Sequence, residues 1–384
     1  MEEVAGSIPV TSTKFNDRGG GFLAAGNKGN SSGRRVKAES LRFMDERTRI
    51  LLVRTDRIGD VTLTTPAVSA LKKKYPLASL TFLTSAYARG VLENNGDLDG
   101  IITERGFFST LGELRRGKFG VAVVFFVNLK VALLVFLAGI PVRLGPASKL
   151  WSVFLNRRVT QRRSGIKKHE ADYNLDLVKE LGADAAPRGA SITLTPAERT
   201  EASAVLSRLG LPGTAFIVAV HPGSGGSALN WPKENFAALA DRLLENFPVK
   251  VLLTGSPAET PLLEEVASRM KGKPFILREA LTLRLFTGLI SRCGLFVTNS
   301  TGPLHLAAAL RVPTLSFFPP IKACSPVRWG PYGGSPAKVL VPPGEACPRC
   351  DREHCARYNC MAAITPDLAF AEAAGILRQI LHAR

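Results

Sequence analysis

Acidic residues are scarce in this sequence: 32 Asp and Glu stand against 50 Lys and Arg among 384 residues, a formal net charge of +18 at pH 7. Such an excess favours an anionic partner, which could be nucleic acid, an anionic membrane face or a phosphorylated substrate. Charge alone does not choose among them. Aromatic residues are also few, at 7%. A basic, zinc-dependent nucleic-acid-binding protein would interleave aromatics with its basic residues, so this class is disfavoured.

The sequence also lacks a long uninterrupted apolar run. The most apolar window, residues 121–140, approaches membrane-spanning length, but Asn128 and Lys130 interrupt it near its centre. A buried strand at 120–127 that runs into a core helix at 129–138 fits this window better. We therefore expect a chain without a membrane span.

Residues 1–48 differ from the rest of the chain. They contain no apolar segment of the secretory type, which argues against export and predicts a cytoplasmic location. They are rich in Gly, Ser and Asn and have no sustained apolar period, so we expect a disordered N-terminal extension. A transit peptide and a start codon assigned too far upstream are the alternatives.

From residue 49 onward, short β-rich runs alternate with helical stretches, which predicts parallel sheets covered by helices on both faces. Two such sets, joined by a helical, Pro- and Gly-marked stretch at 183–213, predict an α/β protein of two doubly wound domains that face each other. The expected strands are 50–53, 80–84, 100–102 and 121–126 in the first set, and 216–220, 249–254, 274–277, 295–298 and 313–318 in the second. The expected helices are 61–75, 86–95, 129–138, 233–247, 258–270, 282–292, 303–311 and 366–382.

Ligands of open α/β sheets bind beyond the carboxyl ends of the strands, and unusual residues follow several strands here. The loop HPGSGGSALNWP, residues 221–232, has three glycines within four positions. Glycines let backbone N–H groups approach an anion closely, although a flexible turn is an equally good interpretation. The loop is neither a G-x-G-x-x-G nor a Walker loop, so a classical dinucleotide or NTP fold is not indicated.

The segment TNSTGPLHLAAAL predicts a second helix N-terminus at the end of a strand. Ser300 or Thr301 can cap this helix, and Pro303 suits its first position. Gly302 allows a close approach, and a helix N-terminus at this place is a ready phosphate site. His305 lies in the first turn, where it could face the anion, and a purely structural histidine is the alternative.

The stretch RTDRIGDV, residues 54–61, places Asp60 where a buried strand turns into a helix. Its simplest role is to cap the helix, catalysis is the alternative, and both roles can coexist. The helix dipole would keep the carboxylate ionised and ready to accept a proton. Arg54 and Arg57 beside it could hold an anionic acceptor or simply neutralise the acid.

Three segments in this order, RTDRIGDVTLTTPAVSALKKKYP, HPGSGGSALNWPKENFAALADRL and NSTGPLHLAAALRVPTLSFF, resemble glycosyltransferase family 9, the heptosyltransferase family. Its members transfer sugars onto lipopolysaccharide cores and related glycans. The resemblance covers roughly residues 49–382 and implies a GT-B fold, in which two Rossmann-like domains face a central cleft. It implies an acceptor-binding domain over 49–190, a nucleotide-sugar-binding domain over 191–365, and a C-terminal helix within 366–384 that packs back toward the first domain.

By this resemblance, Asp60 matches a catalytic base that takes the proton of an acceptor hydroxyl as the hydroxyl attacks the anomeric carbon and inverts it. No cofactor or metal is implied, because no D-x-D sequence is suited to a metal-bound diphosphate. The helix dipole, backbone N–H groups and nearby cations would stabilise the leaving diphosphate instead.

The resemblance also assigns donor-binding positions. Ser224 and Gly225 match contacts to the donor phosphates, Glu259 matches a ribose-binding acid, and Leu281 falls where an apolar side chain packs on the base. The loop for the diphosphate and the sugar comprises Ser300, Thr301, Gly302 and His305. The positions expected to bind the acceptor are Arg54, Arg57, Arg162 and Arg163.

Two positions depart from the family pattern. Heptosyltransferases often carry Lys shortly before the Trp-Pro pair, where Leu229 and Asn230 stand here, and Asp before the Thr-Gly pair, where Ser300 stands. The family resemblance is unaffected, and an ADP-heptose-like donor is expected, but heptose itself is left open against a related sugar. A sugar-nucleotide epimerase or a non-catalytic sugar-nucleotide-binding protein is the alternative.

A basic run, RRVTQRRSGIKKHE at 157–170, has six Arg and Lys among its first twelve residues. A solvated surface is the usual interpretation of such a run. In a family whose acceptors carry phosphate and sit in an anionic membrane, contact with either is equally consistent. We therefore expect a phosphorylated, lipid-linked glycan acceptor and peripheral contact with the inner face of the cytoplasmic membrane, and no nucleic acid.

Four of the six cysteines cluster near the C-terminus with the spacing C-x2-C-x4-C-x4-C: Cys347, Cys350, Cys355 and Cys360. Such a cluster could bind zinc or an iron–sulfur centre. A typical zinc ribbon separates its pairs by more residues. Similar Cys-rich stretches occur in many members of the family that the chain resembles, which suggests a structural clasp, and metal binding is the alternative.

Overall fold

The structure is a computed structural model that describes residues 47–184, 189–347, 350 and 359–382. The expected disordered extension, residues 1–48, lies outside these residues apart from Arg47 and Thr48. None of the described helices combines the length and the apolar character that a membrane span needs.

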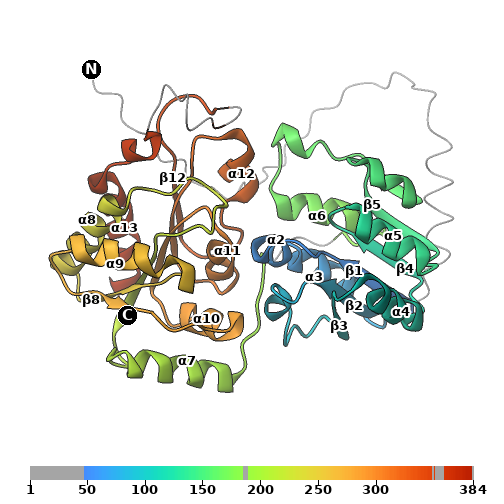
Figure 1. The fold of residues 1–384 in the computed structure, drawn as a ribbon, viewed down its shortest axis with the longest axis horizontal. Coiled ribbons are helices and arrows are strands. Elements are labelled where there is room, and N and C mark those ends of the chain that lie inside the picture. Colours follow the sequence, from blue (N-terminus) through green and yellow to red (C-terminus); the bar gives the residue numbers. More distant parts are fainter. Residues whose placement is uncertain (1–46, 185–188, 348–349, 351–358, 383–384) are drawn as a thin grey trace, which may run out of the picture.

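Two parallel sheets of six strands each form the framework of the protein (Figure 1). The first has the order β3-β2-β1-β4-β5-β6 and the second the order β12-β11-β10-β7-β8-β9. The strands of the first sheet are β1 Arg49–Val53, β2 Ser79–Thr84, β3 Gly100–Thr103, β4 Val121–Val124, β5 Val142–Pro146 and β6 Arg157–Val159. Those of the second are β7 Phe216–His221, β8 Val249–Leu253, β9 Phe275–Ile276, β10 Leu295–Asn299, β11 Thr314–Phe317 and β12 Ala337–Leu340.

Both sheets have the same doubly wound order, which confirms the predicted α/β class. In each, the winding direction reverses beside the first strand: β1 pairs with β2 and β4, and β7 pairs with β8 and β10. Such a reversal opens a crevice at the carboxyl ends of the two strands concerned, which is where these folds bind ligands. The loops after β1, β7 and β10 are therefore the ones to examine.

Helices cover the sheets in positions that the apolar periodicity largely predicts. The α-helices are α2 Ile58–Thr62, α3 Thr65–Lys74, α4 Phe107–Gly117, α5 Leu129–Leu137, α6 Glu170–Lys179, α7 Pro196–Arg208, α8 Lys233–Asn246, α9 Thr260–Arg269, α10 Leu283–Ile290, α11 Gly302–Ala309, α12 Pro326–Trp329 and α13 Pro366–His382. The 3-10 helices are η1 Arg89–Val91, η2 Leu150–Phe154, η3 Arg163–Gly165, η4 Pro257–Glu259, η5 Lys322–Cys324 and η6 Cys360–Ala363.

The sequence-based assignment needs correction at several elements. The helix expected at 61–75 is two helices, α2 and α3, and the one expected at 86–95 is only the short turn η1. Six α-helices and strands were not predicted: α4, β5, β6, α6, α12 and β12. β5 (VRLGP) and β6 (RRV) carry Arg, Gly and Pro near the edge of the sheet, where neither an apolar run nor a strict alternation is needed.

The C-terminal helix also departs from expectation. α13 packs against α8, β11 and β12 of the C-terminal domain, and Ala369, Ala373, Ile376 and Leu377 join the core of that domain. Figure 1 shows it on the side of this domain that faces away from the first sheet. The expected packing toward the N-terminal domain is therefore wrong for residues 366–382, because the apolar stripe of the helix is already buried against α8.

The two halves meet through a shared apolar core. One cluster of buried side chains includes Ile58 and Val61 of α2 together with Leu306 and Ala309 of α11. Helices α2 and α11 pack directly on each other, and they lie side by side at the junction in Figure 1. The ends of the strands β1 and β10 are thereby brought face to face.

Candidate functional site

The helices α2 and α11 of the two halves approach each other closely at Gly59 of α2. A Cβ atom at this position would lie 2.6 Å from Cδ2 of His305, and one at Gly302 would lie 3.6 Å from the backbone nitrogen of Gly59. Only a residue without a side chain fits at Gly59. The helix that follows β1 therefore touches the N-terminal turn of the helix that follows β10.

Asp60 lies in the first turn of α2, one residue beyond this contact. The helix begins at Ile58, and its cap position is held by Arg57 in an extended conformation, so the predicted capping role of Asp60 is wrong. Asp60 is 13% exposed, and Arg54 donates a hydrogen bond from Nη2 to its Oδ1. Among the described residues only Arg54 bonds this carboxylate, which leaves Oδ2 for a ligand.

Arg54 is the fixed neighbour of Asp60. Its guanidinium is buried and also donates to Asp56 at 2.7 Å, Glu170 at 3.1 Å and the side-chain oxygen of Asn174 at 3.3 Å. Burial opposes its charge, but Asp60, Asp56 and Glu170 together raise the pKa of Arg54 above its ordinary value. Arg54 is thus a permanent cation that holds Asp60 in one orientation.

Burial is the largest influence on the pKa of Asp60. It raises the pKa of the Asp60 carboxyl from 3.8 to about 6, with Arg54 opposing the rise and with Asp56 and Glu170 adding to it. The helix dipole was expected to keep the carboxylate ionised, and burial acts against ionisation. At neutral pH the carboxylate is mostly ionised, and it is a stronger base than an exposed aspartate.

Glu170 is a central charged residue that sequence reasoning did not single out. Its side chain is fully buried, and besides Arg54 it accepts hydrogen bonds from Arg163 at 2.5 Å and from Arg328 at 3.0 Å. Burial opposes its ionisation, but the three guanidinium groups outweigh it and lower the pKa of Glu170. The only sequence signal was its place at the end of the basic run 157–170, which suggested a solvated segment.

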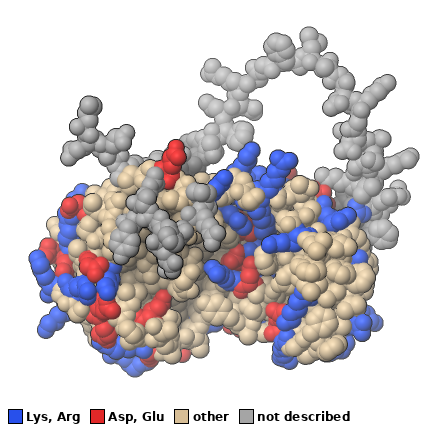
Figure 2. Space-filling view, turned by 45° about the horizontal axis from the view of Figure 1, so that its top comes forward, with Lys and Arg blue, Asp and Glu red and all other residues tan. Residues whose placement is uncertain are grey.

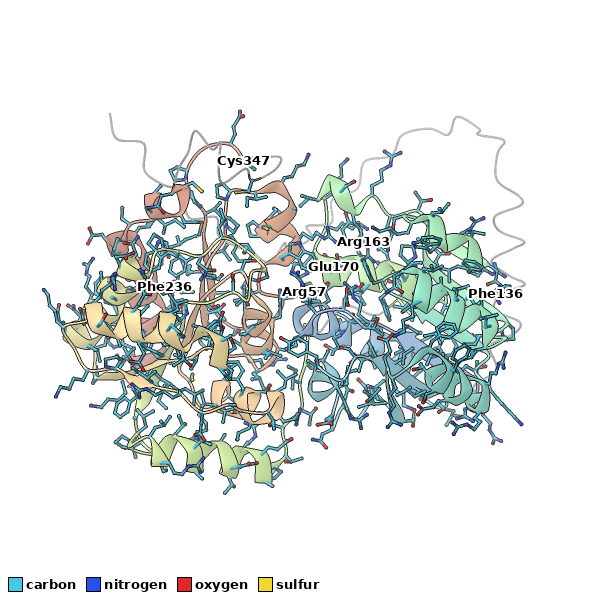
Figure 3. The ribbon with its side chains drawn as sticks, in the orientation of Figure 1. Arg57, Phe136, Arg163, Glu170, Phe236 and Cys347 are labelled. Atoms are coloured by element: carbon cyan, nitrogen blue, oxygen red, sulfur yellow. The ribbon has the colours of Figure 1, made fainter. Side chains whose placement is uncertain are left out.

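The contacts of Glu170 join the two domains. Arg328 belongs to α12 in the C-terminal half, and His169 next to Glu170 bonds the carbonyl oxygen of Gly330 at 2.9 Å. The His169 ring stacks on Tyr332, whose hydroxyl donates to Asp172 at 2.9 Å. Figure 3 shows Glu170, Arg163 and Arg57 together where the two halves meet, and Figure 2 shows Lys, Arg, Asp and Glu gathered there.

The four arginines predicted to bind the acceptor differ in how far their guanidinium groups are available to a ligand. Arg163 bonds Glu170 and Gln161, but its buried Nη2 has no hydrogen-bond partner among the described residues. Burial lowers the pKa of Arg163 to about 10, against the pull of Glu170, so it remains charged at neutral pH. Arg57 and Arg162 are exposed. Arg54, in contrast, is occupied by Asp60 and its other acidic partners.

The side chain of Asn299 bonds both ends of the glycine-rich loop after β7. Sequence reasoning did not single out this residue. Its side-chain oxygen accepts from the backbone nitrogen of Trp231 at 2.8 Å, and its amide nitrogen donates to the carbonyl of Pro222 at 2.7 Å. Within the loop, the Ser224 hydroxyl donates to the carbonyl of Ala228 at 3.0 Å. The available sequence signal was an Asn directly between the expected strand 295–298 and Ser-Thr-Gly-Pro.

Glu259 lies against the same loop. Its Oε1 accepts from the backbone nitrogen of Gly225 at 3.1 Å, and its Oε2 accepts from the backbone and hydroxyl of Ser256. A Cβ on Gly223 would lie 1.9 Å from Oε1, so this glycine is needed for the carboxylate to dock. Burial opposes ionisation, but the hydrogen bonds from Ser256 and Gly225 lower the pKa of Glu259, which keeps it an acceptor of hydrogen bonds.

The start of α11 completes the site. Thr301 is its cap residue, without a side-chain capping bond, and Ser300 bonds the loop through its carbonyl, which accepts from Ser227 at 3.1 Å. His305 is buried, its Nδ1 has no partner among the described residues, and burial with nearby His169 lowers its pKa to about 3. The imidazole is therefore neutral. Leu281 lies earlier in the chain, partly buried just before α10.

The cysteine cluster lies partly outside the described residues, because Cys355 is not among them. Cys347 pairs with Ile321 through its backbone, and burial raises the pKa of Cys324 while neighbouring Arg57 opposes the rise. Within residues 47–184, 189–347, 350 and 359–382, no group of three or more His, Cys, Asp or Glu side chains is arranged to hold a metal ion.

Comparison with known proteins shows to which family the chain belongs. The model of glycosyltransferase family 9 (heptosyltransferase) matches residues 108–359. A candidate glycosyltransferase of Haemophilus influenzae is 30% identical over 345 aligned residues, which cover 86% of this chain and 97% of that protein. Lipopolysaccharide heptosyltransferase 3 of Escherichia coli is 25% identical over 296 residues, with 72% of this chain and 84% of that protein covered.

A solved structure shows the same architecture. The ADP-heptose lipopolysaccharide heptosyltransferase II of Escherichia coli superposes with a TM-score of 0.72 at 22% identity, and the match covers 86% of this chain and 99% of that chain. At this level of identity the likeness shows a shared GT-B fold.

The buried charge cluster gives a first testable expectation. Glu170→Gln leaves three guanidinium groups without their shared anion, so we expect it to lower the free energy of unfolding by about 3–5 kcal/mol. Asp176→Asn is the matched control on the same helix, since Asp176 bonds partly exposed Lys168 at 2.7 Å. Asp176→Asn should lower the free energy of unfolding by at most about 1 kcal/mol. Urea denaturation followed by circular dichroism measures both, and equal losses would contradict the role of Glu170.

Proposed function

Because the chain belongs to glycosyltransferase family 9 and is a glycosyltransferase of the GT-B fold, we propose that it moves a heptose or a related sugar from an ADP-heptose-like donor to a surface-glycan acceptor. The acceptor is a lipopolysaccharide core or a related phosphorylated, lipid-linked glycan. The transfer inverts the anomeric carbon, uses no metal, and employs Asp60 as general base. Heptose as the sugar and ADP as the nucleotide are supported by the names of the similar proteins, which are heptosyltransferases and include an ADP-heptose enzyme.

The packing of α2 on the first turn of α11 is the observation that carries the proposal. It brings the first turn of α2, which carries Asp60, against the N-terminus of α11, and Ser227 of the glycine-rich loop bonds the carbonyl of Ser300 just before that N-terminus. A helix N-terminus stabilises a diphosphate through its free N–H groups and its dipole. A base and a leaving-group site on facing helices suit a displacement in which attack and departure occur on opposite sides of one carbon.

The acceptor hydroxyl donates its proton to Oδ2 of Asp60 while its oxygen forms a bond to the anomeric carbon of the donor sugar. The bond between that carbon and the diphosphate oxygen breaks, and the nucleoside diphosphate leaves with the electron pair. Arg54 holds Oδ1, so the carboxylate keeps its orientation during the transfer. A positioned base of this kind contributes about 10²–10⁴-fold to the rate.

The donor is proposed to lie across the carboxyl ends of β7 and β10. Gly225 and Gly226 have φ values of +55° and +78°, which orient the backbone of the loop in a way that other residues rarely adopt. The ionised Glu259 beside Gly225 suits the ribose hydroxyls, which donate hydrogen bonds. Neutral His305 can bind the diphosphate through a ring N–H but cannot supply a positive charge.

The cations of the site are proposed to act on the acceptor. Arg163 has a buried Nη2 without a partner among the described residues, which suits a phosphate oxygen of the acceptor. Arg57 and Arg162 are exposed near the same junction and can add to this contact. A lipid-linked acceptor would bring the enzyme to the inner face of the cytoplasmic membrane as a peripheral protein.

Asp60→Asn tests the base directly. We expect the rate of transfer to fall by about 10²–10⁴-fold while the affinity for the nucleotide is unchanged, because the amide cannot accept the proton. Burial raises the pKa of Asp60 from 3.8 to about 6, so its ionisation between these pH values costs stability, and the variant should be up to about 3 kcal/mol more stable at pH 7. Transfer assays and urea denaturation measure the two effects. Full activity of a correctly folded variant would refute the assignment.

The same pKa predicts the pH dependence of the wild-type enzyme. Only ionised Asp60 accepts a proton, so kcat/KM should rise with pH up to an inflection at about 6 and then level off. Asp56→Asn removes a negative charge that raises the pKa of Asp60, and it should move the inflection to lower pH. An inflection that stays in place in this variant would show that another group controls the profile.

Titration with nucleotides tests the donor class. At about 100 times its Kd, ADP should stabilise the protein by about 2.7 kcal/mol in a thermal-shift assay, and GDP, UDP and CDP should have smaller effects. Glu259→Gln should weaken the ADP effect through the ribose contact. Glu264→Gln is the control, since Glu264 is exposed on α9 and bonds Arg278 at 2.7 Å. A larger effect of another nucleoside diphosphate would overturn the ADP assignment.

A further inference from the structure

One face of the N-terminal domain exposes an unusual number of large apolar side chains. Six of the eleven large hydrophobic residues that are exposed in the described part of the chain fall between residues 129 and 153. They belong to α5 and to η2: Leu129, Phe136, Leu137, Leu150, Trp151 and Val153. We call these six residues the α5–η2 face.

The residues of this face form one surface. Helix α5 packs against η2, and the rings of Phe136 and Phe154 lie 5.4 Å apart between centroids. Apart from Lys130, which pairs with Glu104, helix α5 is apolar: Val131, Ala132, Leu134 and Val135 are buried in the domain, and Leu129, Phe136 and Leu137 are exposed. A helix with apolar residues on both its buried and its exposed side normally has a partner on each side.

Basic residues surround the α5–η2 face. Residues 105–168 contain thirteen Lys and Arg but a single acidic residue, Glu113. Arg115 of α4 donates to the carbonyl of Leu137 at 3.1 Å, and the Arg143 guanidinium lies 5.3 Å from the ring centre of Phe136. Lys149 and Arg158, on either side of η2, are exposed. Cations thus border the apolar side chains at both α5 and η2.

We propose that the α5–η2 face docks on an anionic phospholipid bilayer. Trp151, Phe136 and the aliphatic residues would enter the interface, where amphipathic and aromatic side chains are stable, and the surrounding Arg and Lys would bind lipid phosphates. A second copy of the chain is a poor occupant, because the cations that border this face (Arg115, Arg143, Lys149 and Arg158) would meet the same cations of the other copy.

The position of the face fits an enzyme that draws its acceptor from a membrane. Phe136 lies at the end of the N-terminal domain that is remote from the C-terminal domain, while Arg163 and Glu170 lie at the junction (Figure 3). Strand β6 runs from the end of η2 toward Arg163, so the basic run 157–170 connects the face to the site. This inference rests on the proposed function only in its choice of a lipid-linked acceptor.

Vesicle flotation of the full chain tests the proposal. The wild type should float with phosphatidylcholine vesicles that contain phosphatidylglycerol and should stay in solution with phosphatidylcholine alone, since the cations need anionic lipid. The double variant Leu150→Ser/Val153→Ser changes side chains that are 78% and 60% exposed, so the fold should persist. We expect it to bind the anionic vesicles about tenfold more weakly at an unchanged thermal midpoint.

The matched control is Leu77→Ser/Tyr87→Ser, which removes two large side chains outside the face that are 60% and 69% exposed. It should bind vesicles as the wild type does. Equal loss in both variants, no flotation of the wild type, or equal flotation without phosphatidylglycerol would each overturn the proposal. So would a dimer in solution that only the Leu150→Ser/Val153→Ser variant dissociates.

A second assay separates this proposal from the proposed function. Transfer to a delipidated, water-soluble acceptor fragment should proceed equally in the wild type and in Leu150→Ser/Val153→Ser, because neither residue lies in the site. Absence of transfer in both, with the expected flotation, would refute the function and leave the docking face intact. Slower transfer by the variant alone would show that these residues serve the site and would overturn a purely docking role.

Discussion

The buried carboxylate of Glu170 is the interaction on which the geometry of the site depends. A carboxylate without access to water needs cations bound to it, and Glu170 has three, from Arg54, Arg163 and Arg328. Two of these belong to the N-terminal domain and one to the C-terminal domain. The need to neutralise Glu170 therefore holds both domains in one arrangement. The same ion pairs fix the guanidinium of Arg54, which orients Asp60.

The second constraint is the missing side chain at Gly59. The charge cluster sets the orientation of the domains, but the distance between α2 and α11 is set by how closely their backbones approach at Gly59 and Gly302. A larger residue at Gly59 would push His305 away and separate the base from the helix N-terminus. A displacement reaction tolerates little such separation, since a misplacement of about 1 Å costs about 100-fold in rate.

Much of this fold could be predicted from the sequence because its signals are local. The apolar runs of β1, β7 and β10, and the glycine and proline punctuation of the loops after them, mark a doubly wound protein and the ends at which it binds ligands. The edge strand β6 and its neighbour β5 escaped prediction, since strands at and next to the edge of this sheet have no continuous apolar run.

The site was only partly predictable, for a different reason. Glu170 binds Arg54 and Arg328, which are 116 and 158 residues away along the chain, and no local pattern reveals such partners. The sequence places Glu170 at the end of a basic run that would ordinarily be solvated. Likewise Asp60 was expected to cap a helix, whereas the extended conformation of Arg57 starts the helix earlier and places Asp60 within its first turn.

The environment of Asp60 represents a balance of two opposing effects. Burial strengthens it as a base, since an exposed aspartate with a pKa near 4 would accept a proton weakly. Burial alone would raise the pKa so far that the group would be protonated, and so inactive as a base, at neutral pH. Arg54 opposes this rise, and the pKa settles at about 6. Arg54 can do so only because Glu170 and Asp56 keep it buried and charged beside Asp60, so the strength of the base depends on the same charge cluster that joins the domains.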